Sequence, residues 1–93
     1  MIENHDLICE IFFSDHKSGV LTSLIGHIDA NQLIHFSNGG EEFIKFKEKY
    51  HPPIYVPDVK EILIYRASNE SFIEENLIGL NKYIRKNSKV KVS

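Results

Sequence analysis

The chain has 93 residues, of which 42% are hydrophobic and 26% are charged, and its formal net charge at pH 7 is −2. This length suits one globular domain spanning residues 1–93, and the ordinary balance of apolar and charged residues excludes a disordered or fibrous chain. The small net charge provides no overall field that would favour nucleic acid or a membrane surface.

Cysteine usage and the N-terminus predict a cytoplasmic protein. The one cysteine, Cys9, has no partner for an internal disulfide, which is typical of a reducing compartment. The N-terminus carries acidic residues where a signal peptide carries basic ones. No apolar run reaches the roughly 18 residues of a membrane-spanning helix, so we expect no membrane association.

The first element is a predicted strand. Leu7–Phe13 is an almost continuous apolar run, which is typical of a strand buried on both faces.

Polar or small residues occupy positions 14–19, and Val20–Ile28 then places its five aliphatic residues on one helical stripe. As a strand, the same segment would have two mixed faces. The pattern therefore favours a helix over residues 20–28, capped by Ser14 or Asp15.

A strand and a second helix are predicted next. Leu33–Phe36 is a short apolar run that indicates a strand. Asn38 and Glu41 stand in the spacing of a capping box, ahead of a helix predicted to end near Tyr50. Pro52 disfavours helical geometry at the residue before it, which explains that end.

The last third of the chain predicts a strand, a helix and an edge strand. Ile62–Tyr65 is an unbroken apolar run, the pattern of a central strand. Ser71 and Glu74 form a second capping box ahead of a helix over residues 72–86. The apolar positions of this helix recur with its period: Ile73, Leu77, Leu80 and Ile84. Residues 89–92 alternate between basic and apolar side chains, as an edge strand does.

The order of these elements, βαβαβαβ, indicates a small α/β domain on a mostly parallel four-stranded sheet. The alternative is an α+β domain in which residues 7–37 form a three-stranded antiparallel meander, with His27 and His35 opposite each other. The polar segment at positions 14–19 decides between them. It is a strand-to-helix loop in the first fold and a hairpin turn in the second.

In the parallel arrangement, three loops at the carboxyl ends of the strands come together and form a candidate anion site. The candidate residues in these loops are Asp15, His16, Lys17, Asn38, Arg66, Ser68 and Asn69. Basic side chains and helix N-terminal amides bind anions, and a histidine beside an acid can move a proton. No phosphate-binding loop, dinucleotide fingerprint or nucleophile elbow accompanies them, so we assign no catalytic residue.

Other chemistry-bearing residues do not form a recognisable site. No two of the five histidines have the four-residue spacing of a helical metal motif, and a single cysteine provides no thiolate cluster. We therefore predict neither a metal nor a cofactor. Glu10 interrupts an apolar strand, where a solvated carboxylate at an edge is a commoner role than a buried catalytic acid.

The stiff segment at residues 50–58, YHPPIYVPD, is the best candidate for a protein contact. Aromatic side chains on a rigid segment anchor interfaces well, because little conformational entropy is lost on binding. The contact residues predicted from this segment are Tyr50, Ile54, Tyr55, Val56 and Asp58.

In the absence of catalytic signatures, the sequence favours a small binding protein of inhibitor or regulatory type that acts by contact with a protein partner. One alternative is a small enzyme, or a module for a small anionic ligand, that uses the loops at the strand ends. Another is a nucleic-acid binder that uses the basic C-terminal end. That end lacks the interleaved aromatic residues typical of single-strand binders, which disfavours nucleic acid as a partner.

Overall fold

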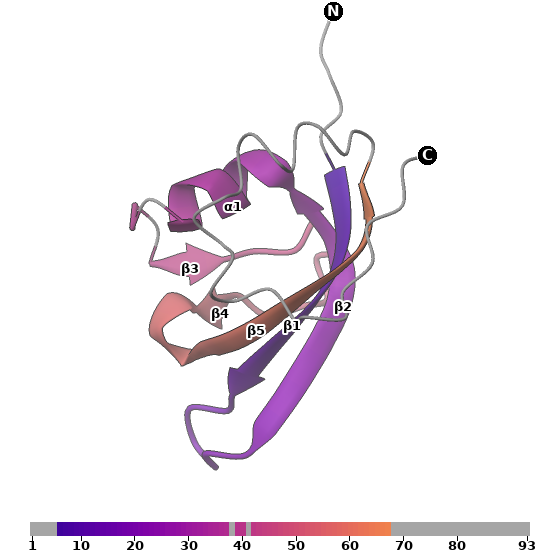
Figure 1. Cartoon of the computed structure of the whole chain (residues 1–93). Coiled ribbons are helices and arrows are strands. Elements are labelled where there is room, and N and C mark those ends of the chain that lie inside the picture. The colour runs from indigo at the N-terminus through magenta and orange to yellow at the C-terminus, as the bar shows by residue number, and fades with distance from the viewer. Residues whose placement is uncertain (1–5, 38, 41, 68–93) are drawn as a thin grey trace, which may run out of the picture.

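A computed structural model describes residues 6–37, 39–40 and 42–67 of the chain. Its elements are, in chain order, β1 (Asp6–Ser14), β2 (Leu21–Asp29), α1 (Ala30–Ser37), β3 (Phe43–Ile44), β4 (Ile54–Tyr55), the 3-10 turn η1 (Val56–Asp58) and β5 (Val59–Ala67) (Figure 1). The predicted helix at residues 72–86 and edge strand at 89–92 lie outside the described residues.

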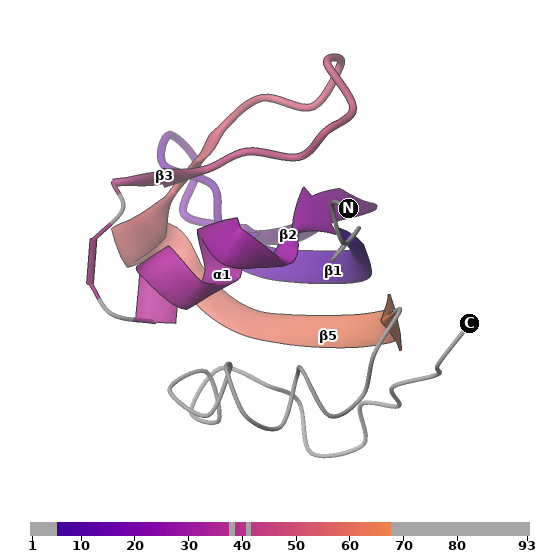
Figure 2. The ribbon, with the colours of Figure 1, turned by 90° about the horizontal axis from the view of Figure 1, so that it is seen from above.

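All strand pairs in the described part of the chain are antiparallel. β1 pairs with β2 on one side and with β5 on the other, so the three strands lie in the order β2-β1-β5 (Figure 2). β3 pairs with β4 in a separate two-stranded sheet. The predicted parallel βαβαβαβ fold is therefore wrong, and the described residues form a small domain of antiparallel strands with one helix, of the α+β or mainly-β class.

The predicted helix over residues 20–28 is wrong, because a hairpin turn returns the chain directly onto β1. The Asp15 N–H donates to the Val20 carbonyl over 2.8 Å, which closes the turn. Gly19 has a φ of +72°, a left-handed conformation that glycine adopts without steric cost. Every residue of β2 then has a partner on β1, from Leu21 opposite Ser14 onward.

The mixed faces of β2 explain why its pattern favoured a helix. Ile28 is fully buried, whereas Leu21 and Ile25, which the helical stripe assigned to the same core, are exposed. Gly26 is also buried and faces the core, where it leaves room for the side chains of Phe46 and Glu48. The strand therefore has aliphatic residues on both of its faces. A helical period places the same residues on one stripe, so their spacing predicts a helix although the segment is a strand.

The predicted strand at Leu33–Phe36 is also wrong, since these residues belong to α1. The Asp29 carboxylate accepts the Asn31 N–H over 2.9 Å at the start of this helix, which is the hydrogen bond of an N-cap. Ala30, Leu33 and Phe36 are buried at helical spacing. The antiparallel meander with His27 opposite His35 is therefore not formed, although its first hairpin is present.

The helix predicted to begin after Glu41 and to end near Tyr50 is absent. The Gln32 side chain occupies both backbone groups of Lys45: it accepts the Lys45 N–H over 2.9 Å and donates to the Lys45 carbonyl over 2.6 Å. The Lys47 N–H donates to the carbonyl of His27 on β2. Tertiary contacts thus take the hydrogen bonds that a helix would use, and only the two residues of β3 are regular.

The core lies between one face of the three-stranded sheet and the layer that contains α1, β3 and β4 (Figure 1). Its fully buried members are Leu7, Cys9, Ile11, Ile28, Ala30, Leu33, Ile44, Ile54, Ile62 and Ile64. The strands predicted at Leu7–Phe13 and Ile62–Tyr65 are confirmed. Among the described strands, however, β1 is the central one and β5 is not.

Candidate functional site

The hairpin turn between β1 and β2 holds His16 at the surface. The Asp15 carboxylate accepts the N–H of Lys17 over 2.8 Å and that of Ser18 over 3.0 Å. These hydrogen bonds, that of Ser18 first, lower the pKa of Asp15. Asp15 therefore stabilises the turn, and its neighbour His16 is left exposed.

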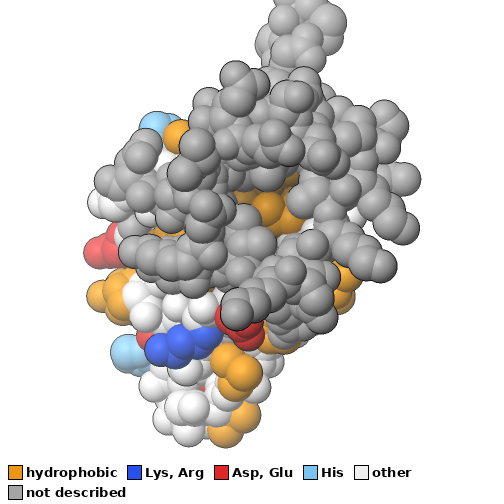
Figure 3. All heavy atoms as spheres, in the orientation of Figure 1, with side chains coloured by type: hydrophobic (Ala, Val, Ile, Leu, Met, Phe, Trp, Pro, Cys, Tyr) orange, Lys and Arg blue, Asp and Glu red, His pale blue; other side chains and the backbone are white. Residues whose placement is uncertain are grey.

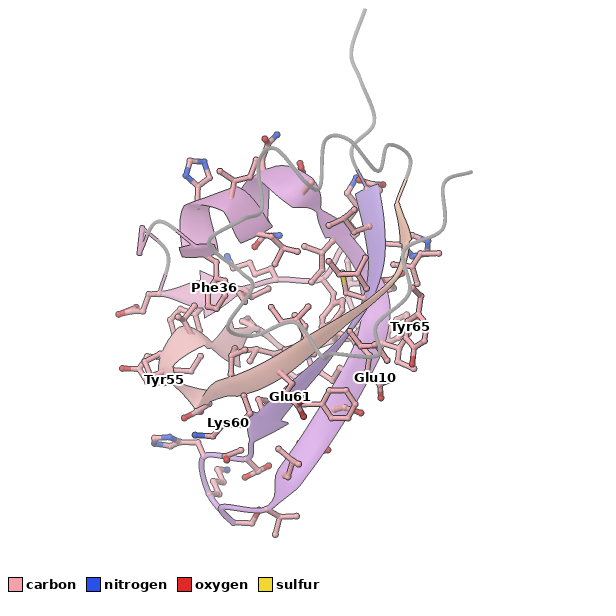
Figure 4. The ribbon with its side chains drawn as sticks, viewed as in Figure 1. Glu10, Phe36, Tyr55, Lys60, Glu61 and Tyr65 are labelled. Atoms are coloured by element: carbon pink, nitrogen blue, oxygen red, sulfur yellow. The ribbon has the colours of Figure 1, made fainter. Side chains whose placement is uncertain are left out.

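His16 lies beside two aromatic side chains from distant parts of the chain. The ring centroids of His16 and Tyr55 are 6.3 Å apart in an edge-to-face arrangement, and those of Phe43 and Tyr55 are 5.6 Å apart. The three side chains line an open pocket of about 430 Å³, which we call the aromatic pocket. Tyr55 points outward on this side of the molecule (Figure 4).

The aromatic pocket is accessible from solvent. Phe43 is 42% exposed and Tyr55 is 40% exposed, although each lies next to a fully buried isoleucine. The pairing of β3 with β4 explains this, because Phe43 is opposite Tyr55 and Ile44 is opposite Ile54. Alternation along each short strand sends one pair of side chains into the core and the other pair outward.

A carboxylate lies beside His16 at the edge of the aromatic pocket, and we call this side of the pocket its rim. Asp58 belongs to η1, and its Oδ2 atom lies 3.8 Å from Nδ1 of His16. The backbone of this region is joined to β3 through the Val56 N–H, which donates to the Glu42 carbonyl over 2.9 Å. The pocket thus combines an apolar floor with an imidazole and a carboxylate at its edge, an arrangement suited to anchoring a side chain.

The residues predicted for a protein contact are divided by the structure. Tyr55 and Asp58 lie at the aromatic pocket, whereas Ile54 is fully buried and Val56 packs against the core. Tyr50 is 79% exposed and contacts the His51 ring instead, in a tilted arrangement with ring centroids 4.7 Å apart.

Two residues of the aromatic pocket were missed by the predicted contact. Phe43 lies in the segment for which the sequence predicts a helix that ends near Tyr50. The alternation of an exposed Phe43 with a buried Ile44 is a signal for a strand, but two residues are too short a run to reveal it. His16 was predicted for the anion site, and only the tertiary structure brings it to Tyr55.

The residues of the predicted anion site do not share one edge in the described part of the chain. Asp15, His16 and Lys17 lie in the hairpin turn, beyond the end of β1 at Ser14. The backbone of Arg66 pairs with Ile8, near the other end of β1. A strand rises about 3.3 Å per residue, so about 20 Å of β1 separates them. The other candidates, Asn38, Ser68 and Asn69, lie outside the described residues.

Glu10 is hydrogen-bonded on the sheet face opposite the core. Its carboxylate accepts the hydroxyl of Ser23 over 2.6 Å and that of Tyr65 over 2.7 Å (Figure 4). These bonds link β1 to both of its neighbouring strands. Cys9 is fully buried, and burial raises the pKa of its thiol to about 12, which disfavours the nucleophilic thiolate.

Neither a metal centre nor a membrane-spanning helix is found in the described residues. Within them, no three histidine, cysteine or carboxylate side chains lie close enough together to hold a metal ion. None of their helices is long and apolar enough to cross a membrane.

Comparison with protein-family models, with characterised proteins and with solved structures finds no match for this chain. The geometry of the aromatic pocket is therefore the main basis for a functional proposal.

Proposed function

We propose that this chain is a small cytoplasmic binding protein, of inhibitor or regulatory type, that contacts a protein partner through the aromatic pocket. The observation that carries the proposal is the convergence of His16, Phe43 and Tyr55, from three separate segments, around an open pocket. Solvent-exposed aromatic residues are favoured anchors of protein interfaces, because they bury a large area with few rotatable bonds.

The stiffness of the surrounding backbone supports this role. Tyr55 is followed by η1, which contains Pro57, and it is preceded by Pro52 and Pro53. A rigid segment loses little conformational entropy when it binds. Asp58 and His16 at the rim provide polar groups that orient a partner, as the polar rim of an interface does.

Quantitative affinity capture tests the proposal with matched variants. The wild-type chain, Tyr55→Ala and Tyr50→Ala are immobilised at equal density, and the proteins they retain from the same lysate are compared by mass spectrometry. We expect one or more proteins to bind the wild type and Tyr50→Ala equally. Their affinity for Tyr55→Ala should fall by about tenfold or more, the effect of losing an interface hot spot.

A second pair of variants distinguishes a contact at the aromatic pocket from a contact elsewhere on the hairpin turn. His16→Ala removes a wall of the pocket and should weaken the binding of the same captured protein. Lys17→Ala, which is also exposed in the turn, should leave that binding unchanged. Thermal unfolding of every variant first establishes that it is folded. Retention of all bound proteins by both Tyr55→Ala and His16→Ala would refute a contact at this pocket.

A further inference from the structure

β2 forms one edge of the three-stranded sheet, and other described residues cover only part of that edge. At the covered part, the Lys47 N–H donates to the His27 carbonyl and the His27 N–H donates to Glu48 Oε1, both over 2.8 Å. Nε2 of the His51 ring lies 2.7 Å from the Ile25 carbonyl oxygen. Segment 47–51 thus engages backbone groups of β2 that point away from β1.

The remainder of the β2 edge, residues 21–24, is open in the part of the chain that the structure describes. Alternate residues of an antiparallel strand direct their backbone N–H and C=O groups to the same side. The backbone groups of Leu21 and Ser23 therefore point away from β1, as those of Ile25 do. No described residue beyond β1 forms a hydrogen bond with the backbone of Leu21 or Ser23. The adjoining side chains are accessible, with Val20 62% and Leu21 56% exposed.

The open edge also lacks the features by which natural proteins prevent strand pairing. Residues 20–26 contain no charged side chain and no proline. The pairing of β1 with β2 is continuous from Leu21 to Asp29, with no bulge that would twist the edge away. A few hydrophobic side chains are exposed among polar side chains and backbone at the lower end of the molecule, where the hairpin projects (Figure 3).

We propose that residues 21–24 pair with the same segment of a second copy of this chain, which joins two sheets across an antiparallel β2–β2 contact. An uncharged segment is self-compatible, because no like charges face each other when two copies meet about a two-fold axis. A partner strand of opposite charge has no countercharge here to recognise. A second copy presents the same uncharged segment with the same open backbone groups, and this match favours it as the occupant.

The free backbone groups select one register. If the two-fold axis passes beside Thr22, Leu21 pairs with Ser23 of the partner subunit and Ser23 pairs with the partner's Leu21, and both pairs are hydrogen-bonded. Val20 then lies opposite the partner's Leu24. This register leaves the contact between His51 and Ile25 intact. The pairing is short, so the dimer is weak and depends on concentration.

Sedimentation velocity of the full chain over a concentration series tests the proposal. We expect the wild type to shift from one chain to two as its concentration rises. Thr22→Lys places like charges opposite each other at the axis and should abolish the shift, whereas Thr22→Val should retain it. Thr22 is exposed, so both variants should fold, which thermal unfolding checks. A wild type that stays monomeric overturns the proposal and leaves this edge to a strand of another protein.

Crosslinking tests the register directly. Cys9 is buried, so Thr22→Cys introduces a single accessible thiol per chain. Directly opposed residues in a non-hydrogen-bonded pair have the separation that a disulfide requires. We expect mild oxidation to link Thr22→Cys at least ten times faster than Lys49→Cys, an exposed control outside the open part of the edge. Equal rates would overturn the proposed register.

Discussion

The Glu48 carboxylate engages both the backbone and the ring of His27. Its Oε1 atom accepts the His27 N–H over 2.8 Å, and its Oε2 atom lies 2.6 Å from Nδ1 of the His27 ring. Beside it, Nζ of Lys47 lies 2.7 Å from Oδ1 of Asp6 at the start of β1. These contacts fix the segment at 47–51 against the sheet edge, and with it the approach to β4.

We expect part of the stability of this protein to disappear in acid because of Glu48. The ring of His27, and next its backbone N–H, favour the charged carboxylate and lower the pKa of Glu48 from 4.5 to about 2. The folded state therefore releases this proton more readily than the unfolded state. The resulting stabilisation is fully present above about pH 5 and is lost as the pH falls towards 2.

Urea unfolding of the wild type and of Glu48→Gln at about pH 6 and pH 3 measures this effect, since glutamine does not titrate. We expect Glu48→Gln to be the less stable protein at pH 6 and the difference between the two to shrink at pH 3. A difference that stays constant would show that Glu48 does not contribute to acid sensitivity.

Gly26→Ala should destabilise the fold, because there is no space for a side chain at this position. A Cβ atom on Gly26 would lie 2.5 Å from Oε1 of Glu48 and 2.6 Å from Cδ1 of Phe46. We expect a loss of about 1–3 kcal/mol in the free energy of unfolding, as for other overpacked sites. Gly40→Ala is the control, since its nearest atom, the His35 carbonyl oxygen, is at an ordinary 3.5 Å. Similar losses for both variants would contradict this view of the packing.

Gln32→Ala should detach the chain at Lys45 from α1. The variant loses both the 2.6 Å bond to the Lys45 carbonyl and the 2.9 Å bond from the Lys45 N–H. We expect a cost of about 1–3 kcal/mol by denaturant unfolding. Gln32→Glu keeps the acceptor but not the donor, so its stability should be intermediate. Faster amide exchange at Lys45 in Gln32→Ala would locate the effect.

Gly19→Ala tests the hairpin turn. No atom lies within 4 Å of a Cβ placed on Gly19, so the effect comes from its φ of +72° alone. The left-handed conformation costs an alanine about 1–2 kcal/mol, and asparagine tolerates it better. We therefore expect a thermal midpoint in the order wild type, then Gly19→Asn, then Gly19→Ala. If alanine and glycine gave the same midpoint, the left-handed turn would be wrong.

The sequence identified two of the strands from apolar runs, although a similar run at Leu33–Phe36 is helical. Leu7–Phe13 and Ile62–Tyr65 are short apolar runs, and both are strands of the observed sheet. It also predicted Tyr55 and Asp58 as contact residues on a proline-braced segment, and the structure places Tyr55 in the lining of the aromatic pocket and Asp58 beside His16. Their function as an interface is still a prediction.

Only the tertiary structure determined the fold class and the composition of the pocket. The aliphatic residues of Val20–Ile28 match a helical stripe, but Gly19 allows a tight turn that pairs the segment with β1 as a strand. The lack of a side chain at Gly26 leaves room for the side chains of Phe46 and Glu48. The segment around Lys45 has a helical pattern that Gln32 overrides, because its amide group satisfies that backbone from a distance. Pairing of β3 with β4 then sets Phe43 beside Tyr55. Such long-range hydrogen bonds leave no periodic trace in the sequence, and they are what assembled this site.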